Sequence, residues 1–149
     1  MVEFLKARID EDEQVARDAN VKQDDLEWWC SPVLAAQLLG EHGAVTVRSR
    51  RDNRPIARVR SESADQPADI LDGTAVAAHI AQHDPKRTLR EVTAKRAIVA
   101  DHAALSSSVW CRICDPGFSN QDAYYPCRTV RIIAAVYVDH PDYRQEWKP

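Results

Sequence analysis

Three cysteines and one histidine stand close together in the C-terminal third of this 149-residue chain. Cys111 and Cys114 have the Cys-x2-Cys spacing, Cys127 follows after twelve intervening residues, and eight residues separate His102 from Cys111. A Cys-x2-Cys turn can hold one zinc ion through two thiolates, and the tetrahedral ion needs two more nitrogen or sulfur donors. We therefore predict a structural Zn²⁺ site, a zinc knuckle within residues 102–138, held by these four side chains.

The fourth ligand is the open part of this prediction. His102 falls in the last turn of an expected helix, one turn beyond Val99 on the apolar face, so its imidazole can face the knuckle. Cys30 and His140 are the alternatives for this position. The metal-free interpretation is a set of buried thiols with a histidine that caps the helix.

The same cysteine pair is compatible with a redox site. A thioredoxin-like motif needs a strand before the first cysteine and a helix that begins at it. Here a run of three serines precedes Cys111, and Asp-Pro-Gly follows Cys114. The surrounding residues therefore favour a metal site over a redox site.

Large apolar residues are scarce, which limits the core that the chain can build. Val, Ile, Leu and Phe together make up only about a fifth of the residues. A chain of this kind gains much from a metal cross-link.

The longest apolar run, 132–138, is too short to span a membrane. The length predicts a single domain over 1–149, and the formal net charge of −3 argues against a general polyanion-binding protein.

Hydrophobic periodicity and turn residues predict an α+β fold. Strict alternation of apolar and polar residues predicts two strands, 45–50 and 56–60, joined by a turn of Arg, Asp, Asn and Pro. Apolar residues at three-to-four spacing predict helices over five segments, 2–20, 33–39, 68–83, 85–105 and 128–138. We expect a small antiparallel β-sheet packed against three or four helices, with the zinc knuckle in the C-terminal third.

The predicted hairpin over 45–60 is rich in arginine. It carries six arginines and one aspartate, and four of the arginines are candidates for contact with nucleic acid or an acidic partner: Arg48, Arg50, Arg58 and Arg60. Clustered guanidinium groups bind phosphates. No aromatic residue lies within 45–60 to stack on bases. A solvated sheet face is therefore the favoured explanation of the charges.

Two histidines, His79 and His83, share one face of an expected helix. This spacing is half of a zinc-protease motif, in which a glutamate beside the first histidine acts as general base. The neighbour here is Ile80, so the mechanism lacks its base. We predict a structural role for the pair.

Several short segments carry a resemblance to a known family. They are FLKARIDEDEQVA at 4–16, HIAQHDP at 79–85, LREV at 89–92, AKR at 94–96, YPC at 125–127 and DHPDYR at 139–144. Together they resemble a family of small proteins from actinobacteria and their phages, the domain of unknown function 6221. The resemblance covers both ends and the helical middle of the chain. It implies a cytoplasmic protein of a bacterium or phage, and it implies no activity.

These features together predict a non-enzymatic, zinc-stabilised binding or regulatory module. We expect an unidentified protein partner and no association with membranes. The alternative is a nucleic-acid-associated regulator that uses the hairpin 45–60. A metal-dependent or thiol-redox enzyme ranks third, because the sequence has neither a glycine-rich phosphate loop nor a nucleophile elbow.

Overall fold

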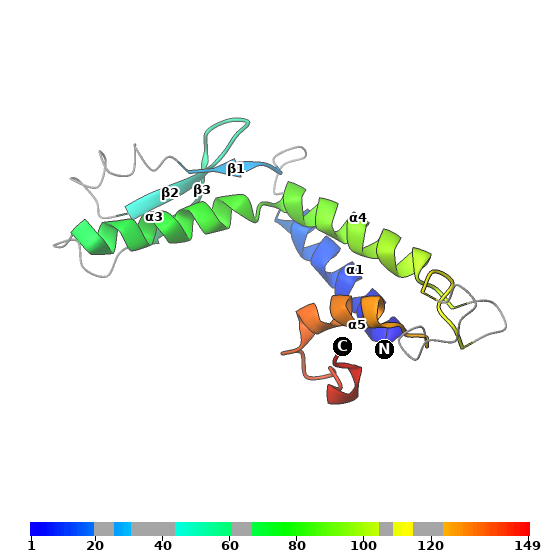
Figure 1. Ribbon diagram of the computed structural model, residues 1–149. Helices are drawn as coiled ribbons and strands as arrows, with labels where there is room; N and C mark the ends of the chain where they lie inside the picture. Colours follow the sequence, from blue (N-terminus) through cyan, green and yellow to red (C-terminus); the bar gives the residue numbers. More distant parts are fainter. Residues whose placement is uncertain (20–25, 31–43, 61–66, 105–108, 115–123) are drawn as a thin grey trace. The chain divides into compact units, whose positions relative to one another are not determined.

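The computed structural model describes residues 1–19, 26–30, 44–60, 67–104, 109–114 and 124–149 (Figure 1). Two compact units make up the chain: unit 1, Met1–Gln14 with Arg90–Pro149, and unit 2, Val15–Leu89. The short helix predicted at 33–39 lies outside the described residues. That 1–149 form a single domain stays a prediction.

Unit 2 contains a three-stranded antiparallel sheet with the order β1–β2–β3. Val47 pairs with Ala57 in the register between the second and third strands, and an irregularity falls between Val47 and Arg48. Helix α3 (Pro67–Gln82) packs along one face of this sheet (Figure 1). The strands are β1 (Trp28–Trp29), β2 (Ala44–Ser49) and β3 (Pro55–Arg60).

Small residues of α3 form the contact with the sheet. Val45 and Val47 of β2 are buried in one cluster with Ala77 and Ala81 of the helix. Gly73 lies one turn before Ala77, and a Cβ atom there would come within 3.9 Å of Val45 Cγ2. Glycine and alanine at four-residue spacing therefore bring the helix backbone close to β2.

A tight turn joins β2 to β3. Ser49 is fully buried, and its Oγ accepts hydrogen bonds from the backbone N–H groups of Arg51 (3.1 Å) and Asp52 (3.4 Å). Asn53 has φ 59°, a left-handed conformation that asparagine tolerates better than most residues. Arg48 closes the turn by donating from Nη1 to the carbonyl oxygen of Asn53 at 2.8 Å.

Unit 1 is built from helical segments, and two of its helices, α1 (Val2–Asp18) and α4 (Pro85–Asp101), extend beyond the unit's bounds at Gln14 and Arg90. Helix α4 begins where the sequence predicts it, because Asp84 Oδ1 accepts a hydrogen bond from the Arg87 N–H at 2.7 Å and Pro85 fills the first helical position. It ends at Asp101 rather than at 105. The helical segments are α1 (Val2–Asp18), α4 (Pro85–Asp101), α5 (Arg128–Ala134) and the 3-10 turns Ala135–Tyr137 and Gln145–Trp147.

The acidic run at 10–13 binds basic side chains of α4. Asp12 Oδ2 accepts hydrogen bonds from Lys95 Nζ at 2.9 Å and from the Tyr137 hydroxyl at 2.6 Å. Lys95 Nζ also lies 3.0 Å from the Tyr137 oxygen, which closes a triangle of three polar groups. Arg96 pairs with Asp10 and with Glu13, at 2.5 Å in each case. These contacts link α1 to α4 within unit 1.

One apolar core holds unit 1 together, and two of the predicted metal ligands belong to it. Cys111 and Cys127 are fully buried. They share the core with residues from both long helices, from α5 and from the tail: Leu5, Ile9, Val92, Val130, Ala134 and Tyr143. A metal bound by these cysteines would therefore cross-link the core itself.

The described residues contain four α-helices and one three-stranded antiparallel sheet, which confirms the predicted α+β class. Within the same residues, none of the helices combines the length and the apolar character needed to cross a bilayer.

Candidate metal centre

The four predicted metal ligands come together in unit 1. His102 Nδ1 lies 3.5 Å from Cys111 Sγ, 3.4 Å from Cys114 Sγ and 3.5 Å from Cys127 Sγ. All four donor atoms lie within 4.8 Å of one another. The cluster could therefore hold one metal ion.

These distances can be compared with those of a tetrahedral zinc site. Zn–S bonds of about 2.3 Å and Zn–N bonds of about 2.0–2.1 Å place the nitrogen and sulfur ligands about 3.6 Å apart at the tetrahedral angle. Each of the three observed nitrogen–sulfur distances, 3.4 to 3.5 Å, is close to this value. These nitrogen–sulfur distances are compatible with a tetrahedral site of three cysteines and one histidine.

Backbone hydrogen bonds place the knuckle beside the end of α4. His102 follows the last residue of the helix, and an isolated β-bridge joins Ala104 to Cys111. The Arg112 N–H donates to the carbonyl oxygen of Ala103 at 3.0 Å. The histidine and the first cysteine are thus fixed by the same short stretch of paired backbone.

Cys127 reaches the cluster from the start of α5. It is the N-cap residue of this helix, with extended backbone angles and no side-chain cap bond, so its sulfur is directed elsewhere. A second isolated bridge, between Trp110 and Tyr124, and a 2.7 Å hydrogen bond from the Tyr125 N–H to the carbonyl oxygen of Val109 bring the two segments together. These two backbone contacts bring the Cys127 sulfur close to the turn that carries Cys111 and Cys114.

The thiols of Cys111 and Cys114 differ in their pKa values. Burial raises the pKa of the Cys111 thiol, but hydrogen bonds from the backbone of Cys114 and Ile113 and the contacts with Cys127 and His102 outweigh it, so that this pKa lies below its ordinary value. Burial and the neighbouring sulfurs raise the pKa of Cys114. A cluster that holds one thiolate thus resists a second, and a divalent cation would offset that repulsion.

Neither alternative for the fourth ligand lies in the cluster. Cys30 packs against the core of unit 2, where burial raises its pKa. His140 contacts the Arg8 guanidinium, stacks edge-on against Phe4 and accepts a 3.1 Å hydrogen bond at Nδ1 from the Asp142 N–H. Among the described residues, the histidine that completes the group is His102.

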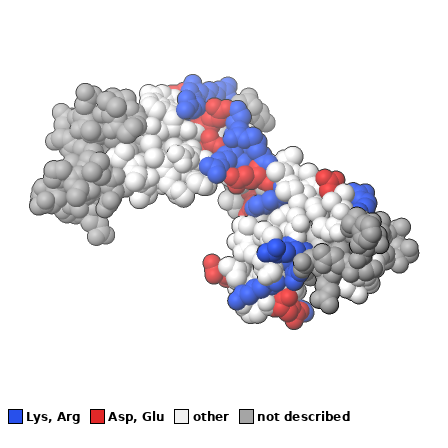
Figure 2. Space-filling model, viewed as in Figure 1, with Lys and Arg blue, Asp and Glu red and all other residues white. Residues whose placement is uncertain are grey.

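The predicted arginine surface belongs to unit 2. Arg50 and Arg58 are exposed and Arg48 is partly exposed, while Arg60 pairs with Ala44 at the end of β3 and its side chain lies outside the description. Figure 2 shows Lys and Arg side chains next to Asp and Glu side chains on the face in view.

His79 lies in the last turn of α3 and His83 follows the helix, and neither is among the four possible metal ligands that the described residues bring together. The rings of His79 and His83 stack with their centroids 4.1 Å apart, and His83 Nδ1 lies 2.9 Å from the carbonyl oxygen of His79. Both residues are exposed. The structural role of the pair stays a prediction.

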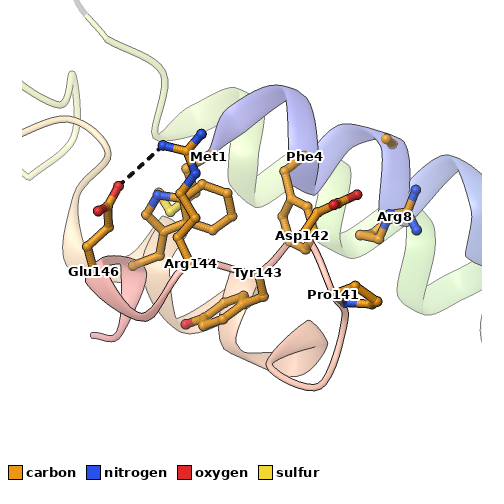
Figure 3. Close-up of a pocket in the computed structure, with 10 residues that line it drawn as sticks. Met1, Phe4, Arg8, Pro141, Asp142, Tyr143, Arg144 and Glu146 are labelled. Carbon is orange, nitrogen blue, oxygen red and sulfur yellow. Dashed lines mark ion pairs between the residues drawn. The ribbon is translucent and has the colours of Figure 1, made fainter.

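A pocket of about 720 Å³ in unit 1 was missed by the sequence reasoning (Figure 3). It lies between the start of α1 and the C-terminal tail, with Phe4, Tyr143 and Trp147 among its walls. Its charged groups compensate one another, since Arg144 pairs with Glu146 at 3.6 Å. The aromatic residues of the tail were the only sequence signal for it, and they equally indicate ordinary packing.

The fold and the cluster define a small α+β protein with a candidate Cys₃His metal centre. The chain belongs to a family of unknown function, DUF6221, whose model matches residues 1–149. No curated protein and no solved structure matches the chain. Family membership therefore assigns no activity, and function must be argued from the geometry.

Proposed function

We propose that this protein is a non-enzymatic binding or regulatory module stabilised by one structural Zn²⁺, with His102, Cys111, Cys114 and Cys127 as the ligands. The observation that carries the proposal is the convergence of one imidazole nitrogen and three sulfurs at 3.4–3.5 Å nitrogen–sulfur separations. Thiolate-rich sets of this kind favour zinc over magnesium or calcium, which prefer oxygen ligands.

Burial and ligand number favour a structural metal over a catalytic one. A catalytic zinc ion keeps one position for water or substrate, whereas four protein donors fill a tetrahedral site. Cys111 and Cys127 are fully buried in the core of unit 1. An ion at this place would contribute to folding and would have no free position for chemistry.

A thiol-redox function is the weaker alternative. The described residues that follow Cys111, 112–114, form a turn, whereas a thioredoxin-like pair would start a helix there. The third sulfur, Cys127 Sγ, and the His102 imidazole nitrogen, 3.5 Å apart, add donors that redox chemistry does not need. All four cysteines are free thiols, and we propose that the protein works in a reducing compartment, the cytoplasm of a bacterium or of a phage-infected cell.

Cobalt substitution tests both the metal and the closed site. Co²⁺ in a tetrahedral thiolate site absorbs visible light strongly, and a small anion such as azide changes this spectrum only if it can reach the metal. We expect one Co²⁺ per chain with a thiolate–cobalt spectrum that azide leaves unchanged. A spectrum that responds to azide would indicate an open, catalytic position. Failure to bind cobalt or zinc would contradict the proposal.

A further inference from the structure

We propose that the outer face of the sheet in unit 2 binds single-stranded nucleic acid, with Trp29 stacking on a base and arginines contacting the phosphates. The outer sheet surface consists of Trp29, Thr46, Arg48, Arg50 and Arg58. This inference does not rest on the zinc site, which lies in unit 1. It gives the binding module a partner of defined chemistry.

Strand register and burial place these residues on one face. Trp28 pairs with Ser49, and Trp28 packs on the buried cluster beneath β2 and α3. Paired residues in a sheet share a face, and successive residues alternate between the two faces. Trp29 and its partner Arg48 therefore lie on the opposite face, away from α3.

The same alternation continues along the next strand pair. Thr46 pairs with Arg58, and both neighbours of Thr46 in β2 are buried on the inner face. Arg58 is exposed, and so is Arg50, which follows the buried Ser49. Arg48, Arg50 and Arg58 thus lie on the same face of the sheet as Thr46.

Trp29 supplies the aromatic group that the hairpin sequence lacks. Its indole Nε1 donates a 3.2 Å hydrogen bond to the carbonyl oxygen of Ser49, which fixes the ring beside β2, and the side chain remains partly exposed. A fixed aromatic ring beside arginines is the combination that binds unpaired bases without regard to their identity. The ring comes from β1, far from the arginines in the sequence but directly opposite Arg48.

The nearby carboxylates are already engaged by other groups. Asp52, the acidic residue of the hairpin, accepts a 3.2 Å hydrogen bond from the Arg54 N–H and lies 3.6 Å from its Nε. Glu27 forms an ion pair with Lys86. Among the described residues, these pairings leave Arg48, Arg50 and Arg58 as the charged members of the outer sheet surface, and their complementarity to phosphate favours a nucleic-acid partner.

The presence of Trp29 also decides which class of partner uses the whole outer sheet surface. Duplex DNA keeps its bases stacked on one another and offers no face to the indole ring. An acidic protein would need the arginines but not an aromatic platform. Single-stranded nucleic acid uses both features of the surface.

The test is the binding of a labelled oligothymidylate to the full-length, zinc-loaded protein, measured by fluorescence anisotropy over a range of salt concentrations. We expect affinity that falls with salt and exceeds the affinity for a duplex of the same length. Arg58→Gln should lower the slope of log K against log [salt] by about 1. Trp29→Leu should weaken binding about fivefold or more, because stacking on one base is worth roughly 1–3 kcal/mol, while Trp29→Phe should retain most of the affinity.

Arg128→Gln is the matched control, because it removes one exposed arginine from unit 1 and should change neither quantity. If Trp29→Leu does not fold, as judged by circular dichroism, the comparison of Arg58→Gln with Arg128→Gln decides. Equal affinity for the duplex would overturn the inference, as would equally tight binding of polyglutamate, the result expected of an acidic-protein site. Absence of binding at low salt would overturn it as well.

Discussion

His102 Nδ1 lies 3.4 Å from Cys114 Sγ, although the two residues belong to different segments, the end of α4 and the knuckle turn. Through this contact the His102 imidazole joins the three cysteine sulfurs as the fourth donor of the candidate metal centre. It also connects the cluster to the apolar core, because the neighbouring sulfurs of Cys111 and Cys127 are part of that core. Metal binding and the stability of unit 1 should therefore change together.

Substitution of single ligands should release the metal and destabilise the protein. Cys111→Ser and Cys127→Ser each remove a buried sulfur donor. A metal ion present at a thousand times its dissociation constant stabilises the folded protein by about 4 kcal/mol. Loss of the metal should therefore lower the melting temperature by about 10 °C. Zinc content and thermal unfolding check this. Cys30→Ser, in unit 2, is the matched control and should keep its zinc.

Removal of the metal should loosen unit 1 selectively. Chelation takes the cross-link from a core that includes Leu5, Val92 and Val130, whereas the core between β2 and α3 contains none of the proposed ligands. Hydrogen exchange should therefore speed up in 124–149 and at the start of α1, and stay nearly unchanged in 44–60. Uniform acceleration in both units would show that the metal does not act through the unit 1 core.

His83→Ala should leave the metal content unchanged. The His83 ring stacks on His79 and contacts its carbonyl oxygen at the exposed end of α3, so the expected loss of stability is about 1 kcal/mol or less. His102→Ala is the companion variant and should lose the zinc. A drop in bound metal in His83→Ala alone would mean that the wrong histidines have been assigned.

The triangle of Asp12, Lys95 and Tyr137 should make the free energy of unfolding depend on pH in the alkaline range. Burial and the hydrogen bond to Asp12 raise the pKa of Tyr137, and the bonds to Tyr137 and Asp12 raise that of Lys95 against the opposing effect of burial. Both groups hold their protons more tightly when the protein is folded. Their contribution is complete below the unfolded pKa values, near 10, and is lost as pH rises above them.

Tyr137→Phe provides the test of this pH dependence. The variant loses the 2.6 Å hydrogen bond to Asp12, which should cost about 1 kcal/mol at neutral pH. Its free energy of unfolding, measured in urea from neutral pH to about pH 11, should then decline less steeply than that of the wild type. Parallel declines would contradict a role for the tyrosine proton.

Local sequence signals predicted most of the fold. The Asp84-Pro85 pair marks the start of α4 through a cap that depends on adjacent residues alone. The inner stripe of α3 was less predictable. Val76, the largest apolar residue beside Ala77, is 50 % exposed, because the sheet packs against the small residues Gly73 and Ala77.

The metal cluster could be predicted because the spacing of cysteines in the sequence indicates a zinc knuckle. Contacts between segments far apart in the sequence could not be predicted in this way. The choice of His102 over Cys30 or His140 depended on where α4 ends. The pairing of Trp29 with Arg48 depends on strand order and register, which no short motif specifies. The aromatic partner of the arginine hairpin was therefore invisible in the sequence of the hairpin itself.

X-ray absorption at the zinc edge of protein purified without chelator tests the central claim most directly. The account predicts one zinc per chain, with three sulfur ligands at about 2.3 Å and one nitrogen ligand at about 2.0 Å. His102→Ala should lose the zinc and with it the absorption edge, while Cys30→Ser keeps the spectrum of the wild type. A protein without zinc, or one in which Cys111 and Cys114 form a disulfide, would contradict the account.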